Sequence, residues 1–355
     1  MDERDINVVD ACGHVSYEQF VSLENLFGAW REFRRGKRHR RDVQIFEFEL
    51  EDNIFALWRE LLSKTYRHGS YESFQITDPK SRKIHKATVR DRVVHQALFR
   101  ILFPVFDKQF ITDSYSCRKK KGTHRAVRRL QTFCNKASAN NTRDVYVLKC
   151  DVRKYFDSVD HHRLMLMAKR VIKDQGVLGL MGEVLQSLDR IKCVALPLGN
   201  VTSQLFANLY LNQLDRFIKH TVRCKYYIRY CDDFVIIQNS LKAAESLIPP
   251  IKIFLEKYLA LSLHPQKINI RTYRQGVDFL GYVVRPHCVT LRACTRRRMF
   301  AKCNSRNITS YLGVLSHCSG AKLRGRLIEK EICLTTLLLL GYICEVLSSK
   351  FSFDF

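Results

Sequence analysis

The stretch Tyr227–Ile237, YIRYCDDFVII, decides the fold that this sequence predicts. Two apolar, β-rich runs, Tyr226–Tyr230 and Phe234–Ile237, flank Asp232 and Asp233, which predicts a hairpin with two adjacent carboxylates at its tight turn. Adjacent aspartates repel each other, and burying either one as an ion requires a counter-charge. Turn chemistry on a solvated loop is the alternative explanation for such a pair. A divalent cation would supply the counter-charge, and oxygen ligands at this density suit Mg²⁺ or Mn²⁺ rather than zinc.

A second acidic position favours the metal-binding interpretation. The β-rich run that begins at Val145 ends on Asp151, which predicts a carboxylate at the end of a strand. Asp151 and Asp232 are 81 residues apart in the chain, so only the fold can bring them together. A strand-end carboxylate and a hairpin pair are the smallest scaffold for two metal ions, which can activate a 3′-hydroxyl and neutralise a leaving pyrophosphate.

Composition and charge indicate a globular protein with a polyanionic partner. The chain has 355 residues, of which 46% are hydrophobic and 27% charged, so two or three packed subdomains are expected. Sixty Lys and Arg residues against 35 Asp and Glu give a net charge of +25. The basic residues cluster at Arg34–Arg41 and Arg118–Arg125, which favours nucleic acid over a merely basic surface.

Cysteine usage and hydropathy predict a cytoplasmic protein that does not enter a membrane. The thirteen cysteines include no C-x-x-C pair, and no signal peptide opens the chain, so reduced thiols are expected. The apolar run Ile332–Leu347 is interrupted by polar residues and is short for a membrane span, so a buried terminal helix is expected there.

Several segments, taken in order, resemble the motifs of reverse transcriptases. The stretch Lys80–Leu98 is similar to the fingers motif of the bacterial and group II intron-like branch. The resemblance covers roughly residues 50–325, and several motifs in order are far more specific than any one of them. The palm motifs are matched by Asp151 with Phe156, LPLGNVTSQ at Leu196–Gln204, YCDD at Tyr230–Asp233 and FLGY at Phe279–Tyr282.

The resemblance implies an α+β protein with a right-hand polymerase architecture. It has fingers, a palm made of an antiparallel sheet with helices on one face, and a helical thumb. We expect an N-terminal basic helical extension at 1–48, fingers at 49–145, a palm with the catalytic motifs at 146–285 and a helical basic thumb at 286–355. Within the palm, Ala243–Leu259 is predicted as a helix interrupted by Pro249 and Pro250.

The resemblance also implies a two-metal site for nucleotidyl transfer, with two Mg²⁺ ions or, as the alternative, Mn²⁺. Asp151, Asp232, Asp233 and Val152 are the expected metal-site residues, and Lys267 matches the lysine that protonates the leaving pyrophosphate, with a surface role as its alternative. The remaining expected contacts are those to substrate, from Lys80, Arg82, Arg153, Lys154, Tyr155, Phe156, Leu198, Gly199 and Gln204, and those to the primer, from Phe279, Leu280, Gly281 and Tyr282.

Residue chemistry agrees with some of the roles that the resemblance implies. The guanidinium of Arg82 suits triphosphate oxygens, and backbone N–H groups of Val152–Tyr155 could cradle phosphates. The ring of Phe156 would collide with a 2′-hydroxyl and so select deoxynucleotides, although simple packing is its alternative role. Gly199 would let the backbone approach the nascent base pair.

The motif Leu198-Gly199-x-x-x-Ser203-Gln204 resembles the diversity-generating retroelement branch. Those enzymes copy a template RNA with errors at adenines, and the cDNA replaces a variable gene segment. Leu198 stands where many polymerases carry a glutamine, and losing that amide should loosen discrimination between base pairs. An antiphage defence or retron-type enzyme is the alternative, followed by a group II intron-derived protein and a non-catalytic RNA-binding scaffold. The implied partners are template RNA, an RNA–DNA heteroduplex, dNTPs and a small basic accessory protein.

Overall fold

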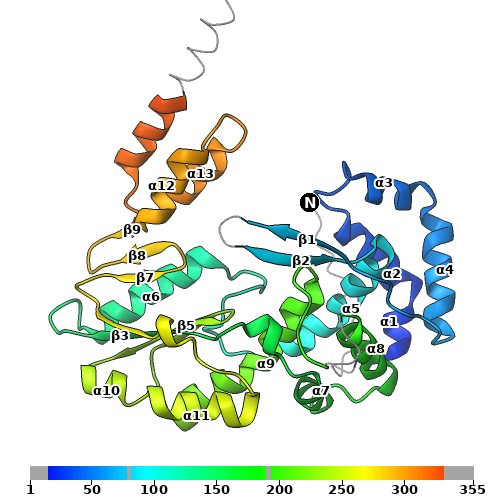
Figure 1. The fold of residues 1–355 in the computed structure, drawn as a ribbon, viewed down its shortest axis with the longest axis horizontal. Coiled ribbons are helices and arrows are strands. Elements are labelled where there is room, and N and C mark those ends of the chain that lie inside the picture. Colours follow the sequence, from blue (N-terminus) through cyan, green and yellow to red (C-terminus); the bar gives the residue numbers. More distant parts are fainter. Residues whose placement is uncertain (1–14, 78–80, 189–192, 332–355) are drawn as a thin grey trace, which may run out of the picture. The chain divides into compact units, whose positions relative to one another are not determined.

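The computed structural model describes residues 15–77, 81–188 and 193–331, which fold into two compact units of mixed helix and strand (Figure 1). The first unit comprises residues 1–122, 149–236 and 245–268, and the second comprises 123–148, 237–244 and 269–355, each as far as it is described. Both units are discontinuous in the chain. Lys80 and the expected helix at 332–347 lie outside the described residues.

The first unit begins with helices that precede a β-hairpin. A capping box between Ser16 and Gln19 starts α1, and the hydroxyl of Ser22 caps α2, so the chain turns at Ser22. The hairpin pairs Glu72 with Lys86 and Ile76 with Arg82. The elements are α1 (Tyr17–Val21), α2 (Leu23–Phe33), α3 (Arg41–Phe48), α4 (Leu50–Leu62), β1 (Glu72–Ile76), β2 (Arg82–Lys86) and α5 (Val89–Asp107).

Helix α9 (Val201–Arg216) is the core helix of the first unit, with apolar residues buried along most of its length. Helices α5, α7 (His161–Lys169) and α11 (Ile248–Leu259) pack against it. The unit also contains η1 (Tyr155–Ser158), α8 (Gln175–Gln186) and η3 (Pro265–Lys267). Pro249 and Pro250 lie in the first turn of α11, after α10 (Leu241–Glu245) has ended. The expected interruption therefore comes before the prolines, which begin a helix because its first turn needs no N–H donors.

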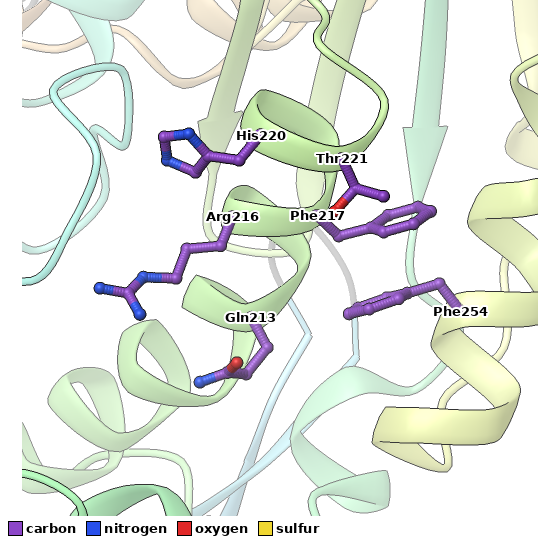
Figure 2. Close-up of a pocket in the computed structure, with 6 residues that line it drawn as sticks. All are labelled: Gln213, Arg216, Phe217, His220, Thr221 and Phe254. Atoms are coloured by element: carbon purple, nitrogen blue, oxygen red, sulfur yellow. The ribbon is translucent and has the colours of Figure 1, made fainter.

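Beyond α9, a π-helical turn η2 (Phe217–Thr221) borders an open surface groove (Figure 2). The rings of Phe217 and Phe254 stack there with centroids 4.2 Å apart, and the side chains of Gln213, Arg216 and His220 project to the other side of the helix. The groove lies at the opposite end of α9 from Val201, so it is separate from the loop that precedes this helix.

A four-stranded sheet has the order β4-β5-β3-β6, from β3 (Tyr146–Asp151), β4 (Tyr227–Tyr230), β5 (Asp233–Gln238) and β6 (Asn269–Thr272). Strands β4 and β5 pair antiparallel with Tyr230 opposite Asp233, so Cys231 and Asp232 form a two-residue turn. Cys231 has a φ of 57°, the left-handed conformation that tight hairpins require. The predicted hairpin is confirmed.

The second unit contains a three-stranded antiparallel sheet and helices. Its elements are α6 (Thr123–Ala137), β7 (Val277–Phe279), β8 (Tyr282–Val284), β9 (Val289–Leu291), α12 (Ala293–Lys302) and α13 (Ile308–Leu315). Leu280 and Gly281 both have positive φ, which makes the β7–β8 turn tight. The hydroxyl of Tyr282 donates to the carbonyl of Val314 at 3.2 Å, which ties the sheet to α13.

A buried ion pair fixes the β4–β5 hairpin to α9. The guanidinium of Arg229 on β4 is fully buried and donates to both carboxylate oxygens of Asp215, each at 2.7 Å. It also donates to the carbonyl of Cys231 and to Oδ1 of Asn208, both at 3.1 Å. Burial alone would lower the pKa of Arg229, but Asp215 more than offsets this, so the net pKa is raised.

We expect Asp215→Ala to destabilise the protein by about 3–5 kcal/mol, because it leaves the Arg229 guanidinium buried without a counter-charge. Asp144→Ala is the matched control, since Asp144 and Arg274 form an exposed ion pair whose loss should cost less than about 1 kcal/mol. Urea unfolding followed by circular dichroism measures both changes. Equal losses for the two variants would contradict the central role of the buried pair.

Candidate active site

Asp151 and the Asp232–Asp233 pair meet in the first unit. Asp151 ends β3, and the N–H of the next residue, Val152, donates to the carbonyl of Asp232 at 3.2 Å. The N–H of Val152 thus joins the end of β3 to the hairpin turn. Asp151 also contributes to raising the pKa of both Asp232 and Asp233. The structure therefore brings the backbone that carries Asp151 next to the turn that carries Asp232 and Asp233.

Burial makes this site costly for negative charge. It is the main cause that raises the pKa of Asp232, with repulsion from Asp151 added. Burial likewise raises the pKa of Asp233 to about 6, against the opposing effect of Lys149. Oδ1 of Asp233 is buried without a hydrogen-bond partner among the described residues. Such carboxylates favour the arrival of a cation.

Two lysines counter two of the carboxylates. Nζ of Lys267 lies 2.6 Å from Oδ1 of Asp151, and Nζ of Lys149 lies 3.2 Å from Oδ2 of Asp233. The turn that carries Lys267 is itself anchored, because the N–H of His264 donates to the carbonyl of Asp151 at 2.8 Å. Lys149 is not among the site residues predicted from the sequence. It lies two residues before Asp151, so the side chains of Lys149 and Asp151 are on one face of β3.

The donor set fits a hard divalent cation. Asp151, Asp232 and Asp233 offer only oxygen ligands, and the unpartnered Oδ1 of Asp233 is available to a cation. Within the residues that the structure describes, however, no three His, Cys, Asp or Glu side chains form a ready-made metal cage. The lysine contacts at Asp151 and Asp233 account for part of this, since they already occupy carboxylate oxygens.

The loop before α9 packs against the fingers hairpin. The N–H of His85 on β2 donates to the carbonyl of Leu198 at 2.9 Å. Gly199 has a φ of +127°, and a Cβ there would lie 2.9 Å from the carbonyl oxygen of His85. Gly199 is thus needed because the loop approaches β2 closely, whereas the sequence predicted an approach to the nascent base pair. Gln204, in the first turn of α9, is exposed and free to face a ligand.

A buried polar network positions this loop. Nδ1 of His95 lies 2.6 Å from the hydroxyl of Thr202, and burial lowers the pKa of His95 to about 3, so its ring is neutral. The amide of Asn200 donates to the hydroxyl of Tyr71 at 3.0 Å. Nε2 of His95 also meets Nε2 of His68 at 3.0 Å, which extends the network towards β1. These contacts join α5 and the start of β1 to the first residues of α9.

The segment after Asp151 only partly matches its expected role. The N–H groups of Val152 and Arg153 already donate to the carbonyls of Asp232 and Ser262, which leaves those of Lys154 and Tyr155 as candidates for a phosphate cradle. The side chain of Tyr155 is buried and donates to the carbonyl of Ala207, so it cannot contact substrate. Phe156 is half-buried, which leaves part of its ring accessible.

The other predicted contacts lie on exposed turns or inside the second unit. Arg82 begins β2 and is exposed, as a triphosphate contact requires. Phe279 and Tyr282 are buried in the second unit, so their side chains pack instead of facing a primer. Leu280 and Gly281, at the β7–β8 turn, remain half-exposed.

Comparisons with known proteins agree with this geometry. A family model described as "Reverse transcriptase (RNA-dependent DNA polymerase)" matches residues 76–284. Protein YkfC of Escherichia coli (strain K12) is 28% identical over 278 residues, 67% of this chain and 72% of YkfC. Group II intron-encoded protein LtrA of Lactococcus lactis is 22% identical over 306 residues, 66% of this chain but only 50% of LtrA.

One solved structure bears on the fold. A telomerase from Candida albicans, in complex with a fragment of telomeric RNA, aligns with a TM-score of 0.51 at 10% identity, covering 72% of this chain and 54% of the telomerase. This likeness confirms the right-hand polymerase fold. In the described part of this chain, no helix is both long and apolar enough to cross a membrane.

We expect Lys149→Met to raise the pKa of Asp233 further above about 6 in the metal-free protein, because it removes the cation that opposes burial. A carboxyl with a raised pKa stays protonated to higher pH, so more of Asp233 is neutral at pH 7 in this variant. NMR titration of protein labelled with ¹³C-aspartate, in the presence of EDTA, measures the change. Lys149→Arg keeps the charge and should leave the titration near wild type, whereas an unchanged titration in Lys149→Met would contradict the ion pair.

Proposed function

We propose, from the premise that this chain belongs to the reverse transcriptase (RNA-dependent DNA polymerase) family, that it copies RNA into DNA at the site of Asp151, Asp232 and Asp233. The observation that carries the proposal is that the end of β3, which carries Asp151, lies beside the β4–β5 turn, where burial raises the pKa of Asp232 and Asp233. Three half-buried carboxylates that offer only oxygen donors suit two-metal nucleotidyl transfer.

The three aspartates would hold two divalent ions, Mg²⁺ or alternatively Mn²⁺, with the carbonyl of Val152 nearby. Bound metal supplies charge neutralisation and activates the 3′-hydroxyl. Lys267 would donate a proton to the leaving pyrophosphate, and the 2.6 Å between its ammonium and Oδ1 of Asp151 supports this role. Arg82, exposed at the start of β2, is free to bind phosphate oxygens.

The proposed substrates are dNTPs and a template RNA, held as an RNA–DNA heteroduplex. The net charge of +25 supports such polyanionic partners. We divide the chain for this role into an N-terminal extension (1–48), fingers (49–145), palm (146–285) and thumb (286–355). The ten described cysteines are all free thiols, which supports a reducing compartment such as the cytoplasm.

Within the family we propose the diversity-generating retroelement branch, with error-prone copying and a small basic accessory protein. The support is Leu198, an alkyl side chain on the loop that precedes α9, at the place where an amide would otherwise contact the base pair. The carbonyl of Leu198 is held by His85, so the position of this residue is fixed and not left to a mobile loop. An antiphage or retron-type enzyme would share the aspartates without adenine-biased errors.

Asp232→Asn should abolish cDNA synthesis, because it removes a metal-binding charge from a buried site while keeping the side-chain shape. Purified protein with a primed RNA template, dNTPs and Mg²⁺ provides the measurement, read as labelled cDNA on a gel. Asp157→Asn is the control, since Asp157 is an exposed carboxylate in η1. Full-length product from Asp232→Asn would overturn the site assignment.

Leu198→Gln should lower the misincorporation frequency several-fold, because an amide restores a hydrogen-bonding contact that discriminates between correct and incorrect pairs. Sequencing of cDNA made from an adenine-containing template gives the error spectrum of both proteins. Leu198→Met, which stays apolar, is the matched control and should keep the wild-type spectrum. A wild-type protein without excess errors at adenine would contradict the branch assignment while leaving polymerase activity intact.

A further inference from the structure

Two histidine rings lie in contact inside the first unit. His68 is 8% exposed and His95 is 1% exposed, and their Nε2 atoms lie 3.0 Å apart. Nδ1 of His68 lies 2.7 Å from the carbonyl oxygen of Gly69. At the other end, Nδ1 of His95 lies 2.6 Å from the hydroxyl oxygen of Thr202. We call this series of contacts the histidine chain, and it runs from the backbone before β1 to the first turn of α9.

The surroundings of both rings favour the neutral imidazole. Burial lowers the pKa of His95 to about 3, so this ring carries no charge at neutral pH. Oδ2 of Asp91 lies 4.0 Å from Nδ1 of His68, which is beyond hydrogen-bonding distance. Asp91 is already paired with Arg90 at 3.0 Å and accepts from the hydroxyl of Thr88 at 2.6 Å. A buried, charged His68 would therefore lack a hydrogen-bonded counter-charge.

The partners of two neutral rings fix the place of each proton. A neutral imidazole has one N–H donor and one nitrogen acceptor. A carbonyl oxygen only accepts, so Nδ1 of His68 donates to Gly69 and Nε2 of His68 is left as an acceptor. Nε2 of His95 then donates to that atom, and Nδ1 of His95 accepts from the hydroxyl of Thr202. Any other arrangement of two neutral rings would place two donors or two acceptors against each other.

A second series of hydrogen bonds, the tyrosine chain, begins two residues earlier. The hydroxyl of Ser187 donates to the carbonyl of Val184 at 2.6 Å. The hydroxyl of Tyr71, 2.8 Å from that of Ser187, therefore donates to it, and the amide of Asn200 donates to Tyr71 at 3.0 Å. The hydroxyl of Tyr71 also lies 3.3 Å from Nε2 of His68, but the lone pair of that nitrogen already accepts from the other ring at a shorter distance. Both chains thus start at the beginning of α9 and end on backbone carbonyls.

The tyrosine chain leaves one acceptor unused. Oδ1 of Asn200, in a residue that is only 3% exposed, has no hydrogen-bond partner among the described residues. Turning the amide over would place Oδ1 against Tyr71, whose O–H is already donated to Ser187. An unpaired acceptor inside a protein costs stability, and such a group needs an explanation beyond packing. A side chain that is held with one acceptor open favours a role in positioning for function.

We propose that the histidine and tyrosine chains position the segment 196–202 for contact with the incoming nucleotide, through the positioning residues His68, His95 and Tyr71. The hydroxyl and the amide at the end of this segment each have a single acceptor, so the segment has one preferred place. Leu198 and Gly199 lie within it and would take that place as well. The contact with nucleotide rests on the proposed function, whereas the order of the protons does not.

NMR of the wild-type protein labelled with ¹⁵N-histidine tests the order of the protons. Two-bond ¹H–¹⁵N correlations at neutral pH distinguish the two tautomers and the charged ring. We expect His68 protonated only on Nδ1 and His95 protonated only on Nε2, with His68→Gln and His95→Gln used to assign the signals. A charged His68, or a His95 protonated on Nδ1, would contradict the proposed hydrogen bonds. This measurement needs no polymerisation and no folded variant other than those used for assignment.

Steady-state kinetics of cDNA synthesis test the positioning role. Thr202→Val keeps the shape of the side chain but removes the donor that starts the histidine chain. We expect the KM for dNTPs to rise by about threefold or more, with kcat within about twofold of wild type, because binding loosens while the three aspartates are unchanged. Tyr71→Phe should act in the same direction through the tyrosine chain. Thr202→Ser restores the hydroxyl and should restore the KM, and Thr221→Val, on the exposed end of η2, is the matched control.

The outcomes separate this inference from the proposed function. Synthesis of cDNA with a wild-type KM in both Thr202→Val and Tyr71→Phe would overturn the positioning role and leave the polymerase assignment intact. A raised KM that Thr202→Ser does not restore would also overturn it. Circular dichroism reports the folding of each variant, and Tyr71→Phe decides the question if Thr202→Val does not fold. A wild-type protein that makes no cDNA would overturn the proposed function, while the tautomers would still test the two chains.

Discussion

The guanidinium of Arg229, buried without contact to water, is the constraint on which the β4–β5 hairpin depends. A charge in that position is stable only while Asp215, Asn208 and the carbonyl of Cys231 accept its hydrogen bonds. The backbone of Arg229 adds two bonds, to Asp113 and Tyr115, which fix a loop beside β4. A shift of the turn that carries Asp232 would therefore leave the buried guanidinium of Arg229 with fewer hydrogen-bond acceptors. This restrains the positions of Asp232 and Asp233.

The site itself is a balance of opposite charges. Asp151, Asp232 and Asp233 are half-buried on neighbouring segments, and desolvation raises the pKa of Asp232 and Asp233. Lys149 and Lys267 offset part of the repulsion. Without the lysines, repulsion between the carboxylates would destabilise the folded protein. With a lysine paired to every carboxylate, no carboxylate oxygen would remain to bind a cation. The unpartnered Oδ1 of Asp233 shows that the compensation is incomplete. Because its negative charge is only partly compensated, the site favours the binding of a cation.

The parts predicted from sequence are those with local signals. Alternating apolar residues and a two-residue turn predicted the hairpin around Asp232, and a β-rich run predicted the strand that ends at Asp151. Asp215 and Arg229 were missed because each is a single charged residue in an apolar stretch, and their pairing is a tertiary event. The signal available in the sequence was the position of each charge, one among the core positions of a helix and the other among those of a strand. Lys149 was missed for the opposite reason, since a lysine on a half-buried strand is unremarkable until Asp233 lies beside it.

The bond between His85 and Leu198 has a mechanical consequence. With the carbonyl of Leu198 held by β2, and Gly199 in direct contact with the same strand, the hairpin and this loop have no room to slide past each other. A displacement of β2 would therefore move Leu198 as well, or break the hydrogen bond between His85 and Leu198. A substitution that adds a Cβ at Gly199 would therefore disturb β2 as well as the loop before α9.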